Sequence, residues 1–263
     1  MEHSIVSWNV NGIRACAKKG FAQWLEGCGA SIIGLQETRA TAAQFPPGLL
    51  EPPGWHTHLC PAERLGYSGV MTLSRRPIDE LQCLLDLPEH DVEGRVQIAR
   101  FGALTVVNAY FPNGSGKNRD NGRVDFKLEF YERLRAMMGE RSARGEKVLV
   151  IGDWNTAHQA IDLARPKENA GTSGFLPVER AALDRWIEDG WVDTFRAFNK
   201  EGGNYSWWSN RAGARERNVG WRIDYILASP AAMPFVKGAQ IHADVLGSDH
   251  CPISVRVEEG IFI

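Results

Sequence analysis

The chain has 263 residues, 43 % of them apolar, and its 30 basic residues nearly balance 32 acidic ones to leave a formal charge of −2. A chain of this size can bury a substantial core. The balanced charge excludes a protein that binds nucleic acid through a large positive net charge, although a local basic groove stays compatible with it. No linker rich in Pro, Gly and Ser divides the sequence, so we predict one domain over residues 1–263.

Short apolar runs in the sequence predict buried strands, and several of them end at polar residues. The runs at 4–8, 31–35, 104–107 and 148–151 lead into Asn9, Gln36 with Glu37, Asn108, and Asp153. A turn at 66–70 precedes a further strand at 71–74. Because a sheet holds its strand ends in fixed positions, these polar residues are candidates for a common site.

Three segments between these runs, at 18–26, 125–144 and 177–189, carry apolar residues at the i, i+3, i+4 spacing of a helix. The third begins with Pro177 and Glu179, which suit a helix start. Strands and helices thus intermix along the chain, which predicts an α/β or α+β fold. The sequence contains neither G-x-G-x-x-G nor G-x-x-x-x-G-K-[ST], so a doubly wound nucleotide-binding fold is disfavoured.

The cysteines and the first residues bear on the compartment. The five cysteines are odd in number, scattered and without a C-x-x-C pair, so neither a disulfide framework nor a zinc site is expected. The chain opens into a strand without a basic start or an apolar signal core. No stretch reaches the ~20 apolar residues of a membrane helix. We therefore expect a cytoplasmic protein without a membrane partner.

The acid clusters at the predicted strand ends each allow two interpretations. Asp153 and Asn155 suit an ordinary turn, or a base that takes a proton from water beside an amide that orients it. Glu37 suits a helix cap or a ligand of Mg²⁺, which prefers carboxylates. Asp249 and His250 suit a surface loop, or a metal ligand next to a phosphate contact, since neighbouring strand residues point to opposite faces.

The segment 218–226 alternates polar and apolar residues and is predicted to be a strand. The alternation places Trp221, Ile223 and Tyr225 on one face, and Arg222 and Asp224 on the other. A role in the core is the simpler interpretation for Trp221. Nearby aromatic and basic residues instead favour stacking on bases or sugars with phosphate contact, and these residues are Trp207, Trp208, Arg211, Arg215 and Arg217.

The order and spacing of ten motifs across nearly the whole chain carry a family resemblance. The motifs lie at 8–12, 35–38, 66–69, 93–95, 110–113, 152–155, 161–163, 174–180, 218–225 and 248–250. In these segments the sequence resembles the exonuclease III / AP endonuclease family, within the wider endonuclease–exonuclease–phosphatase superfamily. The resemblance implies a four-layer α/β sandwich, in which two packed mixed β-sheets are flanked by helices and the active site lies at one edge.

The resemblance also implies an activity and its partners. The expected reaction is Mg²⁺-dependent hydrolysis of the phosphodiester 5′ to an abasic site, with 3′-phosphodiesterase and 3′→5′ exonuclease activity, and with Mn²⁺ as a substitute metal. The expected substrate is double-stranded DNA with abasic sites or blocked 3′ ends, and the expected state is a monomer. One alternative is a protein that is mainly a 3′→5′ exodeoxyribonuclease. Two remote alternatives are an inositol or lipid phosphatase and a non-catalytic nucleic-acid-binding relative.

Carried over residue by residue, the resemblance implies a catalytic set. Glu37 matches the principal Mg²⁺ ligand, and the metal side further includes Asn9, Asp249, Asp153, Asn155 and His250. Asp153 matches the acid that activates the attacking water, with the amide of Asn155 beside it. His250 matches the histidine that contacts the scissile phosphate, oriented by Asp224. Tyr110 matches the residue that helps the leaving oxygen.

The resemblance further implies a DNA-binding set around these residues. Trp207, Trp221 and Ile223 match a small apolar pocket for a flipped, base-less deoxyribose. The positions that match DNA-backbone or phosphate contacts are Arg14, Arg39, Tyr67, Arg95, Asn113 and Asn169, and the segment 113–123 matches a loop that enters the DNA. Asn11 stands where animal members carry Asp.

Overall fold

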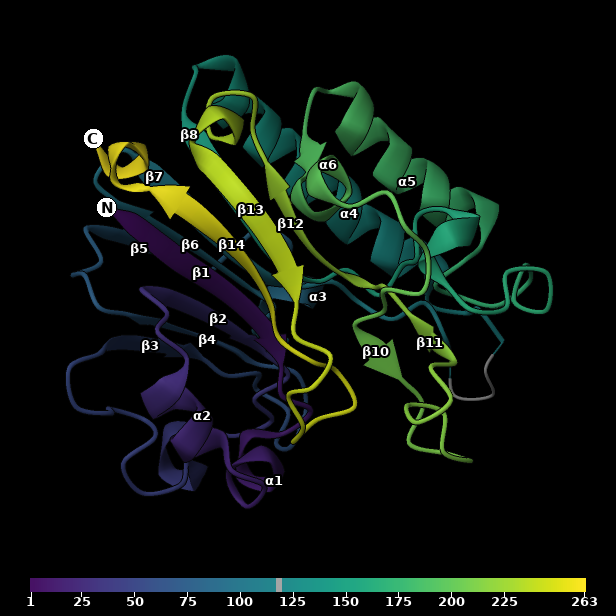
Figure 1. The fold of residues 1–263 in the computed structure, drawn as a ribbon, viewed down its shortest axis with the longest axis horizontal. Coiled ribbons are helices and arrows are strands. Elements are labelled where there is room, and N and C mark those ends of the chain that lie inside the picture. Colours follow the sequence, from purple (N-terminus) through teal and green to yellow (C-terminus); the bar gives the residue numbers. More distant parts are fainter. Residues whose placement is uncertain (117–119) are drawn as a thin grey trace.

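Two six-stranded mixed sheets pack face to face between two layers of helices in this computed structural model, which describes residues 1–116 and 120–263 (Figure 1). The first sheet has the order β13-β14-β1-β2-β4-β3 and the second the order β5-β6-β7-β8-β12-β9. The predicted four-layer α/β sandwich is thereby confirmed.

The predicted apolar runs form the strands that lie side by side at the centre of each sheet. The first sheet consists of β1 (Glu2–Asn9), β2 (Ile32–Gln36), β3 (His56–Cys60), β4 (Val70–Ser74), β13 (Val236–Ile241) and β14 (Ile253–Glu258). The second consists of β5 (Glu80–Gln82), β6 (Val96–Phe101), β7 (Leu104–Tyr110), β8 (Lys147–Asp153), β9 (Val192–Asp193) and β12 (Asp224–Ala228). A separate two-stranded ribbon pairs β10 (Trp207–Trp208) with β11 (Gly220–Trp221).

The helices cover the two outer faces of the sandwich, except for the last short one, which contacts strands of both sheets. They are α1 (Ile13–Ala17), α2 (Phe21–Gly27), α3 (Pro88–Asp91), α4 (Val124–Ala143), α5 (Pro177–Glu188) and α6 (Thr194–Phe198). The predictions at 125–144 and 177–189 are confirmed. The helix predicted at 18–26 begins only at Phe21, because Gly20 precedes it in the left-handed conformation with φ 98° and thereby separates α1 from α2. Within the described segments, no helix combines the length and apolar character needed to cross a membrane.

Three apolar cores separate the four layers. One lies between α1–α2 and the first sheet and includes Trp8 and Phe21. A second, with Leu149 and Val255, fills the space between the sheets. The third packs α4 and α5 on the outer face of the second sheet. The cores therefore hold both sheets rigidly, and side chains at the strand ends inherit that rigidity.

The expectation for the cysteines needs a correction, because Cys60 and Cys83 form a disulfide with their Cα atoms 6.8 Å apart. Cys60 ends β3 and Cys83 follows β5, so the bond joins the edge strand of one sheet to the edge strand of the other. The two cysteines are 23 residues apart in the sequence, and this spacing did not indicate a disulfide, since the two thiols meet only when the sheets stack.

The prediction of one strand at 218–226 is also corrected. The segment forms β11 and β12, which belong to different sheets, and residues 222–223 between them lie in neither strand. The alternation of side-chain directions therefore does not continue from β11 into β12. Trp221 and Ile223 do pack together, but Tyr225 lies in the core under α4 and α5. The guanidinium of Arg222 stacks over the Tyr225 ring at 4.4 Å instead of lying on the Asp224 side.

Candidate functional site

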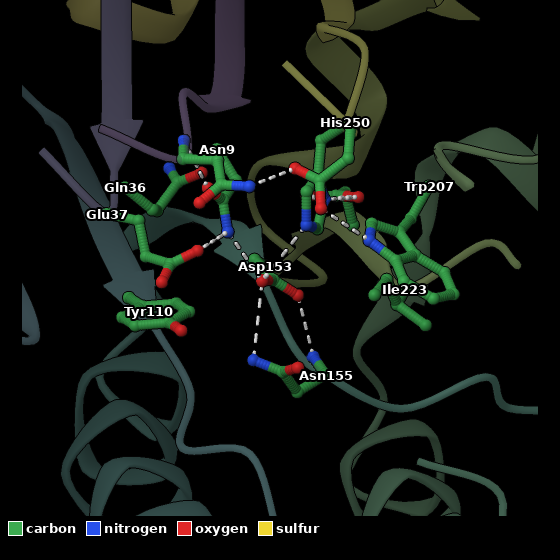
Figure 2. Close-up of polar contacts among 12 residues, drawn as sticks. Asn9, Gln36, Glu37, Tyr110, Asp153, Asn155, Trp207, Ile223 and His250 are labelled. Carbon is green, nitrogen blue, oxygen red and sulfur yellow. Dashed lines mark hydrogen bonds and ion pairs between the residues drawn. The ribbon is translucent and has the colours of Figure 1, made fainter. Parts of the chain in front are cut away.

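The polar strand ends converge at one edge of the sandwich, as Figure 2 shows. The strands β1 and β2 run parallel in the first sheet, and β7 and β8 run parallel in the second. Their carboxyl ends bring Asn9, Glu37, Tyr110 and Asp153 to the same place. The strand β12 runs antiparallel to β8 and pairs Asp224 with Asp153, so its first residue joins the same group.

The backbone at these ends is bent by residues with positive φ. Gly152 has φ 152°, and a Cβ there would lie 1.8 Å from the carbonyl oxygen of Ala109, so only glycine fits before Asp153. Glu37 and Asn155 adopt the left-handed conformation, with φ 54° and 51°. Such conformations are uncommon for non-glycine residues and gather at functional sites.

Asp153 is the centre of the hydrogen-bond network and is only 1 % exposed. Its carboxylate accepts a hydrogen bond from the Asn9 side chain at 2.8 Å and from the backbone N–H of Asn155 at 2.8 Å. The same Asn9 amide donates to Glu37 at 3.1 Å. Asn9 therefore links the carboxylates of the two sheets and sets their separation.

Asp249 and His250 lie next to one another but have different partners, as their predicted division of roles requires. The Asp249 carboxylate accepts hydrogen bonds from Asn11 at 2.7 Å and from the Trp207 indole at 3.1 Å. Nδ1 of His250 lies 2.9 Å from the Asp224 carboxylate, and its Nε2 lies 3.8 Å from that of Asp153. The imidazole thus stands between two buried carboxylates.

The buried charges in this group shift the pKa values of its members. Burial alone would lower the pKa of His250, but the carboxylates of Asp224 and Asp153 outweigh it and raise the pKa to about 10. The imidazole is therefore a cation at neutral pH. Burial raises the pKa of Asp153 above its ordinary range, while the His250 cation and the hydrogen bonds from Asn155 and Asn9 act in the opposite direction.

Tyr110 faces the same space from the end of β7. Burial and the neighbouring Glu37 carboxylate raise its pKa well above 10, so the phenol keeps its proton at neutral pH. Arg95, which matches a position near the DNA backbone, has a side chain that is only 2 % exposed. Its guanidinium lies over the Tyr110 ring at 4.6 Å and donates to the Tyr110 carbonyl and the Tyr67 hydroxyl, so it supports Tyr110 from behind.

An open pocket of about 650 Å³ exposes these groups to solvent. One wall is polar and includes Glu37, Asp153 and His250, and an apolar wall adjoins it. The apolar wall contains Trp207, Trp221 and Ile223, backed by Leu163 and Phe175. The two indoles meet edge to face at 6.3 Å. The predicted pocket residues therefore do lie together, beside the polar group.

The remaining predicted DNA contacts lie around the pocket with unequal exposure. Arg39 and Asn113 line it, and Arg39 is paired with Glu37 at 2.6 Å. Tyr67 does not line it, and Arg123 donates to the Tyr67 hydroxyl at 3.3 Å. Arg14 and Asn169 are bonded to backbone carbonyls and do not line the pocket. Of the predicted DNA-entering loop at 113–123, residues 117–119 lie outside the described residues.

A family model for the endonuclease/exonuclease/phosphatase family matches residues 6–250, and so covers every residue of the pocket and both sheets except β14 and the start of β1. The chain belongs to this family. An exodeoxyribonuclease of Bacillus subtilis (strain 168) is 40 % identical over 255 residues, which are 96 % of this chain and 98 % of that relative. A DNA-(apurinic or apyrimidinic site) endonuclease of Dictyostelium discoideum is 34 % identical over 97 % of this chain and 70 % of its own length.

A solved structure of a 3′ phosphatase, NExo, from Neisseria, bound to a product DNA hairpin, is also similar, with a TM-score of 0.88 at 26 % identity over 97 % of this chain and 99 % of that one. Within the endonuclease/exonuclease/phosphatase family, the resemblance to its exonuclease III and AP endonuclease members is thereby confirmed.

Nucleases of the endonuclease/exonuclease/phosphatase family depend on a divalent metal, and the donor chemistry of the pocket fits a hard cation. Its polar wall offers carboxylate and amide oxygens from Glu37, Asp249 and Asn11, which are ligands that Mg²⁺ prefers. Donor atoms of Asp153, Asp224 and His250 also lie within 4.8 Å of one another. That second group is an ion-paired hydrogen-bond network, because a protonated imidazole has no free lone pair for a metal.

Several supporting residues were missed by the sequence analysis. Lys127 and Glu179 form a fully buried ion pair at 2.6 Å, and Lys127 also donates to the Asn155 carbonyl at 2.7 Å. Ser206 donates to the Asp224 carboxylate at 2.6 Å. Arg215, expected near phosphate, instead donates to three loop carbonyls, those of Ala243, Val245 and Ser248. The helical pattern placed Lys127 on α4 but held no sign of its partner.

Proposed function

We propose that this protein is a DNA-repair AP endonuclease, which hydrolyses the phosphodiester 5′ to an abasic site and also acts as a 3′-phosphodiesterase and a 3′→5′ exonuclease. The observation that carries the proposal is one open pocket whose polar wall holds Asp153 and His250 and whose apolar wall holds Trp207 and Trp221. Residues 1–263 act as one domain and as a monomer inside the cell, since both sheets of one chain supply the wall residues.

Mg²⁺ is the proposed cofactor, with Mn²⁺ as a substitute. Glu37 and Asp249 hold the metal through their carboxylates, with Asn9, Asn155 and Asp153 close to it on the same wall. When bound, the metal neutralises charge on the phosphate oxygens of the substrate. His250 was assigned by resemblance both to the metal and to the phosphate. The phosphate role is favoured because Asp224 occupies its Nδ1 and holds it as a cation.

Asp153 takes the proton of the attacking water in the proposed reaction. Its buried carboxylate is oriented by hydrogen bonds from Asn9 and Asn155, so it needs no reorganisation during the step. The His250 cation donates a hydrogen bond from Nε2 to the phosphate, where negative charge builds up. Tyr110 retains its proton at neutral pH and donates to the leaving oxygen.

The apolar wall supplies the substrate selection in this proposal. A deoxyribose without a base presents an apolar ring face that stacks against Trp207, Trp221 and Ile223, and the missing base lowers the cost of turning the sugar out of the helix. The superfamily's inositol and lipid phosphatases would need polar groups for a polyhydroxyl or headgroup there. A non-catalytic relative would not need the buried Asp153–His250–Asp224 network.

One gel assay tests the proposal against its alternatives. Purified protein with Mg²⁺ is incubated with three duplexes, which carry an internal abasic site, a 3′-phosphate or no damage. We expect nicking of the first and trimming of the second at rates well above digestion of the third. An intact abasic duplex together with rapid digestion from undamaged 3′ ends would make the exodeoxyribonuclease alternative the main activity.

The pH dependence of activity tests the role of the His250 cation. Because Asp224 raises the pKa of His250, Asp224→Asn is expected to lower that pKa from its wild-type value of about 10. The cationic form exists below the pKa, so the decline of kcat/KM at alkaline pH should begin at a lower pH in the variant than in the wild type, where His250 keeps its charge up to a pKa of about 10. A matched control is Asp244→Asn in an exposed loop. A variant profile of unchanged shape, merely scaled down, would contradict the role.

Removing an indole tests the proposed sugar pocket. Trp221→Ala is expected to lower single-turnover nicking of abasic DNA by about 5–150-fold, because one stacking contact is worth about 1–3 kcal/mol. The enlarged pocket should also lower the ratio of abasic to undamaged cleavage. The exposed aromatic Phe198 provides the control Phe198→Ala. An unchanged ratio in Trp221→Ala would show that the apolar wall does not select abasic DNA.

A further inference from the structure

A second cluster of chemically reactive side chains lies at a lateral edge of the sandwich, where β3 and β5 are the outermost strands of their respective sheets. His58 and Cys60 are two residues apart on β3, so their side chains point to the same face. Their neighbour Leu59 points into the core under α1 and α2, which leaves His58 and Cys60 facing the second sheet. Cys83 meets them from the end of β5, and its sulfur is bonded to that of Cys60.

The three side chains offer one imidazole nitrogen and two sulfurs that all lie within 4.8 Å of one another. A tetrahedral zinc site has Zn–S bonds of about 2.3 Å, which places its two sulfurs about 3.8 Å apart. The disulfide of Cys60 and Cys83 has its Cα atoms 6.8 Å apart, at the upper end of the range for such bonds. Small side-chain rotations after reduction are therefore enough to reach the spacing that zinc requires.

We infer that reduced Cys60 and Cys83, together with His58, form a site for Zn²⁺ that is an alternative to the disulfide. Soft thiolates with an imidazole select zinc over the hard cation of the nuclease pocket. Two thiolates, one neutral imidazole and Zn²⁺ sum to zero charge, which suits a half-buried position. A solvent molecule takes the fourth position, and His58 lines an open surface groove together with Leu81.

The surrounding backbone holds part of this site in place without the disulfide. Cys60 is paired with Val70 in the sheet. A Cβ on Gly94 would lie 2.6 Å from the Pro61 backbone, so the chain after Cys60 packs tightly against Gly94. Cys83 follows a three-residue edge strand that pairs only with β6 among the described strands. The ligands on β3 are thus preorganised, and Cys83 is the one that moves.

Atoms and electrons are conserved in the exchange between the disulfide and the zinc-bound form. A cellular dithiol reduces the bond by giving one hydrogen to each sulfur and closing its own disulfide. On binding Zn²⁺, each thiol loses its proton to the buffer and its sulfur forms a bond to the metal, so affinity rises with pH.

Cobalt spectroscopy tests the inference, because Co²⁺ bonded to thiolate absorbs strongly in the near ultraviolet and Co²⁺ in an oxygen site does not. The protein is reduced with a water-soluble phosphine, which becomes its oxide with oxygen from water, and is desalted without air. We expect one equivalent of Co²⁺ to give the thiolate absorption and Zn²⁺ to remove it. Unreduced protein should show none.

Variants separate this site from other thiols. Cys83→Ser should abolish the absorption, and His58→Ala, which leaves both cysteines in place, should weaken cobalt binding at least about tenfold. The free, half-buried Cys28 supplies the control Cys28→Ser, which should bind as the wild type does. Reduced wild-type protein without the thiolate absorption, or Cys83→Ser with an undiminished one, would overturn the inference. Neither outcome bears on the proposed nuclease activity.

Discussion

Replacing Asp153 by asparagine is expected to slow Mg²⁺-dependent nicking of abasic DNA by about 10²–10⁴-fold, the usual contribution of a positioned proton acceptor. The amide has nearly the same shape but cannot take the proton of the attacking water. The affinity for abasic duplex should remain or rise, because the substitution removes a negative charge from the surface that meets phosphate. Single-turnover rates at saturating protein, with affinity from a gel shift in Ca²⁺, separate these two effects.

The control for this variant is again Asp244→Asn, which makes the same chemical change on an exposed loop outside the pocket. A thermal unfolding curve of each variant checks that the hydrogen bonds from Asn9 and Asn155 tolerate the amide. Retention of wild-type rate in a folded Asp153→Asn protein would show that another group accepts the proton, and the proposed mechanism would be abandoned.

Replacing Glu37 by glutamine is expected to change the metal requirement instead of the proton transfer. Loss of one of the two proposed carboxylate ligands should raise the Mg²⁺ concentration for half-maximal rate by at least about 100-fold, because groups that only support a ligand already contribute 10–100-fold. The rate should recover in part at high Mg²⁺. In Asp153→Asn, by contrast, added Mg²⁺ should restore little, so a metal titration distinguishes the two roles.

Glu89→Gln, an exposed substitution on α3, is the matched control for Glu37→Gln. Glu37 is also paired with Arg39 at 2.6 Å, and its replacement frees that guanidinium. A rise in DNA affinity without a change in the Mg²⁺ titration would therefore mean that Glu37 restrains Arg39 and does not hold the metal.

The sequence predicted the strand-end groups because local patterns determine them. An apolar run ends at Asp153 and another precedes Glu37, and the parallel pairing of β1 with β2 and of β7 with β8 then brings both to one edge. Glycine at 152, needed for the close approach to Ala109, is likewise visible as a motif. These features depend on residues that are near one another in the chain.

What the sequence did not predict depends on how separate elements stack. Arg95 matched a position near the DNA backbone, and no pattern in the sequence indicated that its guanidinium lies behind Tyr110 once β6 and β7 pair. Lys127 finds its partner Glu179 only because α4 and α5 pack side by side on the second sheet. Cys60 and Cys83 meet only where the edges of two sheets approach. No short-range pattern carries such information.

The chemistry at the nick is the most direct test of the central claim that this pocket hydrolyses a phosphodiester with water. A duplex with one abasic site is incubated with the protein and Mg²⁺, and the masses of the strand fragments are measured. We predict a 3′-hydroxyl on the upstream fragment and a 5′-deoxyribose phosphate on the downstream one, with no cleavage in EDTA. A cut on the 3′ side of the sugar that leaves an unsaturated aldehyde, formed by elimination without added water, would contradict the account.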